Sequence, residues 1–195
     1  MKIIGLTGGI GSGKSTLMRW LQSKGIPCFE SDKVGKELLN TELKQKIIDN
    51  FGSQLYVTGN LDRKQLAELV FNDTAILKKL NKIVHPAVGN AFKKFKEENK
   101  AAPIIIKESA ILFEEGIYKK CDSVILVSAT QEERISRVMQ RDGVSRKAVL
   151  QRMTNQWDDE KKRPLADFVI ENNSIETAKN QFEAVLTELL TKEKD

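Results

Sequence analysis

The stretch Gly8-Gly9-Ile10-Gly11-Ser12-Gly13-Lys14-Ser15 decides how this 195-residue chain is expected to fold. It matches the pattern G-x-x-x-x-G-K-[ST] at every fixed position, and this pattern forms a loop that binds phosphates. The apolar run from Lys2 to Thr7 precedes it and reads as a buried strand. From Lys14 to Lys24 the apolar residues fall on one helical face. Strand, loop and helix in this order predict that the chain binds a nucleoside triphosphate.

The residue types of the loop indicate how it would hold ATP. Glycines let the backbone wrap closely around phosphates, and the positive end of the following helix attracts the anion. Lys14 is expected to reach the β- and γ-phosphates, and the Ser15 hydroxyl to bind Mg²⁺. A glycine-rich turn with a chance lysine is disfavoured by the flanking strand and helix. The residues expected to bind ATP here are Gly9, Gly11, Ser12, Gly13, Lys14, Ser15 and Thr16.

Four more short apolar runs follow the first strand, at residues 26–29, 103–107, 123–128 and 167–170. Helical patterns separate them, and five such strands predict a parallel sheet covered on both faces. The expected fold is therefore α/β, a three-layer P-loop NTPase fold with a five-stranded parallel sheet. Bilayer crossing is not expected, because no apolar run approaches roughly 20 residues.

The region between the second and third strands is mostly helical in pattern. Asp62 is a plausible cap for one of its helices, and Pro86 is expected to end another. An insertion of this length predicts a substrate-binding subdomain within a single domain spanning 1–195. The expected parts are a core of about 1–32, 101–133 and 164–195, a helical acceptor-binding insertion of about 33–100, and a helical lid of about 134–163.

The excess positive charge lies in the expected lid. The net charge is +5, and residues 134–163 hold nine basic and four acidic side chains, so the rest of the chain is balanced. The spacing of Arg134, Arg137 and Arg141 places them on one helical face. A solvated charged face is one interpretation, and a clamp on the transferred phosphoryl group is the favoured one. Only Trp157 lies near these arginines, so a nucleic-acid surface is disfavoured.

Two acceptor-side candidates stand outside the loop. Asp32 follows the second strand, where a carboxylate can accept a hydroxyl proton during transfer, although Asp32 or Ser31 can equally cap the next helix. His85 is the only histidine, and a lone histidine is more often structural than catalytic.

Cys28 and Cys121 lie far apart and form no C-x-x-C pair, which fits a reducing compartment. With one histidine and no cysteine cluster, no transition-metal site is expected. Ile3–Leu6 is too short for a signal-peptide core, so a cytoplasmic location is expected.

Taken together, these motifs resemble the dephospho-coenzyme A kinase family over nearly the whole chain. The opening loop is similar to that family's form of the pattern, although related kinases come close to it. The order and spacing of the later segments are more specific. These segments are Gly59–Arg63 with Leu66 and Val70-Phe71, Ile83–Pro86, Ile111–Glu114, the Gln131–Arg141 pattern, Asp142-Gly143, Gln156 and Ala166–Asn172.

The resemblance implies transfer of the ATP γ-phosphoryl group to the 3′-hydroxyl of dephospho-coenzyme A, the last step of coenzyme A synthesis. It implies that Asp32 is the catalytic base, that Arg137 and Arg141 reach phosphates, and that Asn172 lies near the adenine of ATP. It also implies an acceptor site lined by His85, Leu112, Phe113 and Glu114. The implied partners are small molecules, with no nucleic acid and no membrane; the oligomeric state stays open.

Two positions depart from the family pattern. Glu30-Ser31-Asp32 stands where D-A-D is usual, and Ala110 stands where a proline usually precedes the L-L-x-E segment.

Another P-loop kinase, acting on a nucleotide or a shikimate-like hydroxyl, is the rival function among enzymes. A GTP-dependent switch is the rival from another class, since Asp32–Gly35 fits D-x-x-G, but no N-K-x-D motif occurs.

Overall fold

The structure, a computed structural model, describes residues 1–71 and 73–191. These residues divide into two compact units, each with its own core. The first unit comprises Met1–Glu30 and the chain from Asn99 onward, and the second comprises Ser31–Glu98.

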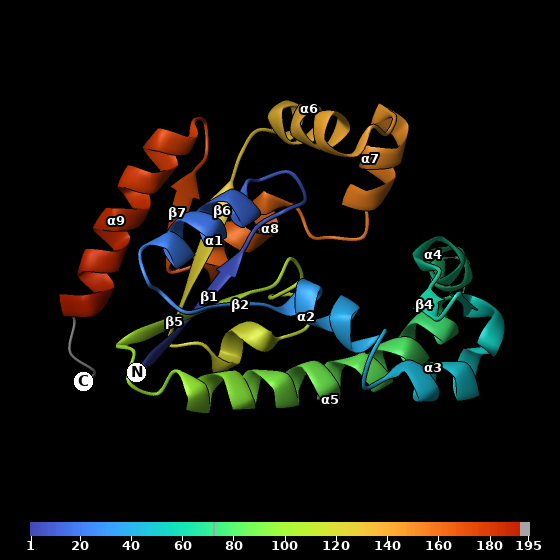
Figure 1. The fold of residues 1–195 in the computed structure, drawn as a ribbon. Coiled ribbons are helices and arrows are strands. Elements are labelled where there is room, and N and C mark those ends of the chain that lie inside the picture. The colour runs from blue at the N-terminus through green and yellow to red at the C-terminus, as the bar shows by residue number, and fades with distance from the viewer. Residues whose placement is uncertain (72, 192–195) are drawn as a thin grey trace. The chain divides into compact units, whose positions relative to one another are not determined.

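The first unit is built on a five-stranded sheet of order β2-β5-β1-β6-β7 in which every neighbouring pair is parallel. The predicted α/β fold with five parallel strands is therefore confirmed, with strand ends shifted by at most two residues. β1 leads directly into the glycine-rich loop, as the apolar run before it predicted (Figure 1). The strands are β1 (Lys2–Thr7), β2 (Cys28–Glu30), β5 (Ile104–Glu108), β6 (Ser123–Ser128) and β7 (Phe168–Glu171).

Helices α1 (Lys14–Ser23) and α9 (Ile175–Thr191) cover one face of this sheet (Figure 1). Alternate strand residues such as Ile4 and Leu6 are fully buried beneath them. The rings of Trp20 and Phe182 meet edge to face, with centroids 5.9 Å apart, which joins the two helices. These contacts hold the helix after the loop firmly against the sheet.

The opposite face of the sheet packs against the segment after β5. Leu112, Phe113 and Val124 form its centre, next to the short 3-10 helix η2 (Ile117–Lys120). Gly5 of β1 faces this cluster, and a Cβ atom there would stand 2.8 Å from Leu112 Cδ2. The absence of a side chain at Gly5 thus lets Leu112 pack directly on β1.

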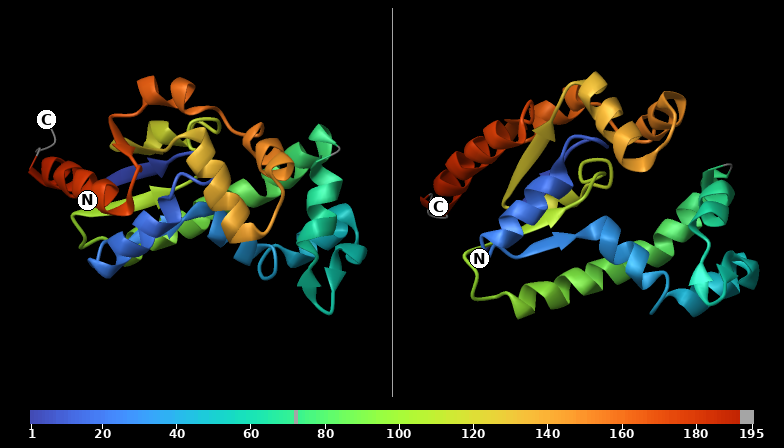
Figure 2. Two further views of the ribbon diagram at one scale, coloured as in Figure 1. Left: turned by 90° about the horizontal axis from the view of Figure 1, so that it is seen from above. Right: turned by 45° about the horizontal axis from the view of Figure 1, so that its top comes forward.

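The segment 131–165 forms three helices and the 3-10 helix η3 (Arg163–Leu165). Thr130 and Glu133 form a capping box at the start of the first helix, and Gly143 ends it with φ 65°. The first helix therefore ends at Asp142, with Gly143 as its C-cap. Ile135, Val138 and Val149 form one apolar cluster that packs the first two helices together. The two helices lie side by side in both views of Figure 2. The helices are α6 (Gln131–Asp142), α7 (Arg146–Met153) and α8 (Asp159–Lys162).

The second unit is mainly helical, as its pattern predicted, with one short hairpin that the pattern did not predict. In Figure 2 this hairpin lies with α3 and α4 near one end of α5. The side chain of Asp62 accepts hydrogen bonds from the N–H groups of Lys64 and Gln65, which confirms it as a helix cap. The elements are α2 (Ser31–Leu38), α3 (Lys44–Phe51), η1 (Ser53–Leu55), β3 (Tyr56–Val57), β4 (Asn60–Leu61), α4 (Arg63–Phe71) and α5 (Thr74–Glu98).

The expected helix end at Pro86 is wrong. Helix α5 continues through both residues as one element of 25 residues. A proline removes one helical hydrogen bond and disfavours helical geometry at the residue before it. Leu80 and Ala87, on either side of Pro86, are buried in the same core, and this packing outweighs the local cost.

Helix α5 is the longest helix of the described residues, and it is too polar to cross a membrane. The other helices in the described part of the chain also lack the length or the apolar character for a crossing.

Candidate active site

The glycine-rich loop joins β1 to α1 through backbone conformations that favour glycine. Gly11 and Gly13 have φ values of 81° and 98°, in the left-handed region. A Cβ atom on Gly11 would collide with the backbone oxygen of Arg134, and one on Gly13 with the side-chain nitrogen of Asn172. The loop is therefore enclosed by α6 and by the end of β7, and neither glycine can carry a side chain.

Lys14 lies over the loop that it follows. Its ammonium donates a hydrogen bond of 2.6 Å to the Gly8 carbonyl and lies 3.9 Å from the carboxylate of Glu108 at the end of β5. Only 8% of Lys14 is exposed. A single positive charge is thus held at the carboxyl edge of the parallel sheet, where this class of fold binds its ligands.

The start of α1 has the features of an anion site. Its N-cap is Gly13, so no side chain caps the first turn. Backbone N–H groups there, together with the helix dipole, favour a negatively charged ligand. Ser15 and Thr16 are exposed residues in this first turn. Within the described residues, no group of three or more His, Cys, Asp or Glu side chains could hold a metal ion.

Asn172 connects the loop to the rest of the sheet. Its side-chain nitrogen donates to the Ser12 carbonyl at 2.7 Å, and its backbone N–H donates to the Ser128 carbonyl at 2.7 Å. Its own carbonyl accepts a hydrogen bond of 2.8 Å from Arg137 Nη2. The structure thus brings Asn172 and Arg137 together beside the loop, and the role of Asn172 near adenine stays a prediction.

The three arginines of α6 differ in their surroundings. Arg137 is half-buried, and its buried Nη1 atom has no hydrogen-bond partner in the described part of the chain. Arg141 is exposed and pairs at 2.7 Å with Asp142, which also pairs with Arg152. Hydrogen bonds from Arg141 are the main cause that lowers the pKa of Asp142 to about 2. The roles of Arg137 and Arg141 as phosphate ligands therefore stay predictions. Of the two, Arg137 is linked to the loop residue Ser12 by hydrogen bonds through Asn172.

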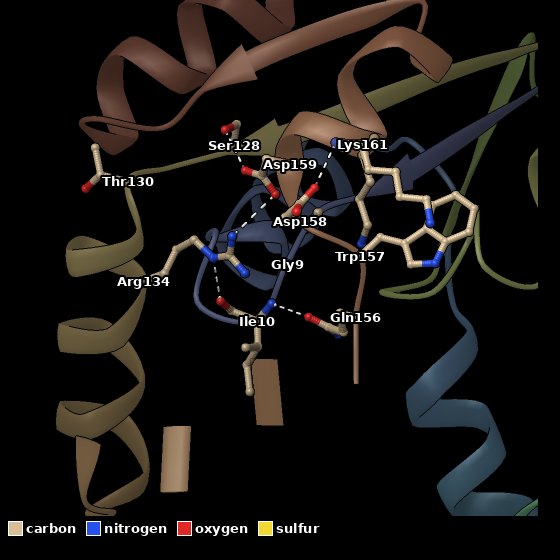
Figure 3. A network of polar contacts seen from close by, with 12 residues as sticks. Gly9, Ile10, Ser128, Thr130, Arg134, Gln156, Trp157, Asp158, Asp159 and Lys161 are labelled. Carbon is tan, nitrogen blue, oxygen red and sulfur yellow. Dashed lines mark hydrogen bonds and ion pairs between the residues drawn. The ribbon is translucent and has the colours of Figure 1, made fainter. Parts of the chain in front are cut away.

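Three contacts around the loop could not be predicted from the sequence. Arg134 donates to the Ile10 carbonyl at 3.0 Å, Gln156 accepts from the Ile10 N–H at 2.8 Å, and Asp159 pairs with Arg134 (Figure 3). Helical spacing placed Arg134 only in the expected phosphate clamp, Gln156 belonged only to the family resemblance, and Asp159 was not singled out. The separations of 124 and 146 residues from Ile10 explain why no local pattern showed these contacts.

The segment predicted to line the acceptor site is mostly buried. Leu112 and Phe113 are 0% and 2% exposed and pack in the cluster beneath β1. Glu114 accepts a hydrogen bond from the Trp157 N–H at 2.9 Å and pairs at 3.1 Å with Lys162, whose side chain is fully buried. The structure therefore shows packing and structural contacts for these residues, and their binding of the acceptor stays a prediction.

Replacing Lys162 with methionine is expected to lower the free energy of unfolding by about 3 kcal/mol, because Glu114 is left buried without its cation. Urea unfolding followed by circular dichroism measures the change. The matched control is Lys161→Met, which removes only a cation–π contact of an exposed side chain with Trp157 and is expected to cost below about 1 kcal/mol. Equal stability of the two variants would contradict the structural importance of the Glu114–Lys162 pair.

A cavity of about 550 Å³ borders the loop through Arg134 and Gln156. Its walls come from α6, α7 and the segment that leads to α8, so it lies wholly within the first unit. The lining is Gln131, Arg134, Lys147, Leu150, Gln151, Met153, Thr154, Gln156, Trp157 and Asp158.

The other two predicted residues belong to the second unit. Asp32 is exposed and is the second residue of α2, which begins directly after β2. It therefore lies inside the first turn of the helix and does not precede it as a cap. His85 is exposed in the middle of α5. The structure describes the two units separately, so the approach of Asp32 and His85 to the loop stays a prediction.

The matches to known proteins extend over both units of this chain. The dephospho-CoA kinase family model matches residues 2–177. The dephospho-CoA kinase of Fusobacterium nucleatum is 41% identical over 174 residues, which are 88% of this chain and 90% of that protein. A solved structure from Thermus thermophilus is 39% identical, with a TM-score of 0.85, and covers 96% of this chain and 97% of its own. The dephospho-CoA kinase of Campylobacter jejuni is 27% identical, with a TM-score of 0.65 and coverage of 96% and 97%.

Proposed function

The chain belongs to the dephospho-CoA kinase family, and from this we propose that it transfers the γ-phosphoryl group of ATP to the 3′-hydroxyl of the dephospho-CoA ribose. The products are coenzyme A and ADP, and the reaction is the last step of coenzyme A synthesis. One observation carries the proposal: a complete phosphate-binding loop, with Lys14 at its base, in a chain that matches this family over residues 2–177.

The residues present fit a Mg²⁺–nucleotide complex. Mg²⁺ prefers oxygen ligands and usually keeps waters and substrate phosphates in its coordination sphere, so few protein ligands are needed. The exposed hydroxyl of Ser15, in the first turn of α1, supplies such an oxygen. The bound ion would neutralise charge on the phosphates and help to orient them. Gly9, Gly11, Ser12, Gly13 and Thr16 complete the loop that holds the nucleotide.

We assign the positive side chains around the loop to binding the phosphates of ATP, including the γ-phosphoryl group that is transferred. Lys14 binds the β- and γ-phosphates and stabilises the charge that develops on them. Arg137 and Arg141 reach the phosphates from α6. To do so, Arg141 gives up its ion pair with Asp142 and binds a phosphate instead. Among the described residues the buried Nη1 atom of Arg137 has no acceptor, which supports this assignment, because a buried guanidinium nitrogen is costly without one. Asn172 lies near the adenine of ATP.

The acceptor side of the mechanism rests on the second unit and on the segment after β5. Asp32 orients the attacking hydroxyl or accepts its proton, and an exposed carboxylate directly after β2 suits that role. His85, Leu112, Phe113 and Glu114 line the acceptor site. Residues 134–163 act as a lid that excludes water, which otherwise competes as the acceptor. The enzyme works in the cytoplasm on small molecules.

The test is ATP-dependent product formation from dephospho-CoA, followed by mass spectrometry. Shikimate and a nucleoside monophosphate serve as control acceptors, because other kinases share this loop. We expect a product heavier by one phosphoryl group from dephospho-CoA alone. Turnover of a control acceptor without turnover of dephospho-CoA would keep the kinase chemistry and refute the proposed substrate.

A further inference from the structure

Arg134 stands out because its guanidinium is buried against the phosphate-binding loop. Only 7% of the residue is exposed, and its Nε atom donates a hydrogen bond of 3.0 Å to the Ile10 carbonyl. A Cβ atom placed on Gly9 would collide with Nη2 of the same side chain. Figure 3 shows the guanidinium pointing at the loop between Ile10 and Asp159. A charged group in this position has been removed from most of its water.

Both backbone polar groups of Ile10 form hydrogen bonds with side chains from outside the loop. Its carbonyl accepts from Arg134, and its N–H donates to Oε1 of Gln156 at 2.8 Å (Figure 3). Its side chain packs against the cluster of Ile135, Val138 and Val149. Three separate contacts therefore fix one residue at the centre of a glycine-rich loop, whose glycines would otherwise allow many conformations.

Asp159 holds the guanidinium in place. One carboxylate oxygen lies 3.3 Å from Arg134 Nη1, and the other accepts a hydrogen bond of 2.6 Å from the Ser128 hydroxyl at the end of β6. The Asp159 side chain is only 13% exposed, so the pair is shielded from solvent. Burial lowers the pKa of Arg134, whereas the charge of Asp159 acts in the opposite direction. The carboxylate thus compensates for the lost hydration and ties the arginine to the sheet.

We infer that Arg134, oriented by Asp159, is a positioning residue. It fixes the orientation of the peptide bond between Ile10 and Gly11 and so keeps the loop ready to bind nucleotide phosphates. A phosphate-binding loop works by presenting several N–H groups inward, and a peptide that turns over presents a carbonyl instead. Arg134 uses Nε and Nη1 on protein partners and acts through Ile10. Arg134 therefore affects the affinity for the nucleotide. The rate of the transfer step depends on Lys14 and the other phosphate ligands.

The inference rests on the proposed function only in requiring a nucleotide as the ligand. The test is titration calorimetry with Mg²⁺–ADP and no acceptor, on Arg134→Lys and Asp159→Asn. Lysine keeps the charge but cannot contact Ile10 and Asp159 through one planar fork. We expect Kd to rise about tenfold or more in each variant, as for a lost hydrogen bond to a charged group. The double variant should resemble the single variants, because both act through one contact.

Steady-state kinetics separate positioning from catalysis. In the same variants KM for ATP should rise while kcat stays within about twofold of the unaltered enzyme. The matched control is Glu183→Gln, which like Asp159→Asn removes the carboxylate of an ion pair, here an exposed pair with Lys24 at the far end of α1, and its Kd and KM should be unchanged. Thermal unfolding of all variants shows how far each change affects stability alone.

Two results would overturn the inference. A lower unfolding temperature with an unchanged Kd would make the Arg134–Asp159 pair purely structural. A fall in kcat at unchanged KM would place Arg134 on the transferred group itself. If the unaltered protein binds Mg²⁺–ADP but does not phosphorylate dephospho-CoA, the proposed function fails, and the calorimetric test of Arg134 still stands.

Discussion

Replacing Lys14 with alanine is expected to lower kcat/KM for ATP by on the order of 10³-fold. The ammonium is the loop's own cation, held 2.6 Å from the Gly8 carbonyl at the carboxyl edge of the sheet. In a shielded site a positioned charge stabilises phosphate oxygens far better than water does, and more so as charge develops during transfer. The variant should therefore lose both ATP affinity and turnover. Initial rates at varied ATP concentration measure the two separately.

Lys24→Ala is the matched control for this prediction. Lys24 caps the other end of α1, where its exposed side chain pairs with Glu183. Its removal should change kcat/KM by less than about twofold, since exposed ion pairs contribute little. Circular dichroism and thermal unfolding must show that the Lys14 variant is folded, because Glu108 lies beside the deleted ammonium. Full activity in a folded Lys14→Ala protein would refute the role of the loop.

Replacing Asp32 with asparagine is expected to reduce kcat by roughly 10²- to 10⁴-fold while KM for ATP changes little. Asparagine has nearly the same shape and still accepts a hydrogen bond, but it cannot take the proton of the attacking hydroxyl. Asp32 is exposed in the first turn of α2, directly after β2, so the change should not disturb packing. Single-turnover measurements at saturating ATP and dephospho-CoA report the transfer step.

The matched control for Asp32 lies on the same helix. Glu37→Gln neutralises another exposed carboxylate of α2 and should leave kcat within about twofold of the unaltered enzyme. Isothermal titration with Mg²⁺–ADP should show the same affinity in the Asp32 and Glu37 variants. Unchanged turnover in Asp32→Asn would remove Asp32 from the mechanism, and a large loss in Glu37→Gln would point to a general effect of charge on this helix.

Tertiary packing overrode local signals at several points in the second unit. Pro86 is a strong local signal for a helix end, yet the shared core of Leu80 and Ala87 keeps α5 continuous. The hairpin of β3 and β4 has only two residues in each strand, too few for an alternating pattern to be visible. Asp62, in contrast, acts through the N–H groups of Lys64 and Gln65, and such a local cap could be predicted.

The sequence by itself determined the strand–loop–helix that begins the chain and the five parallel strands, because each of these elements depends on residues close together in the chain. It also determined the family, through the order and spacing of short motifs. Only the tertiary structure decided that Arg134 and Gln156 hold Ile10 and that Glu114 pairs with Lys162. The physical reason is separation along the chain. Contacts between residues that lie tens to more than a hundred positions apart form only when the fold brings their segments together, and no local pattern of charge or hydrophobicity records which partner each side chain will meet.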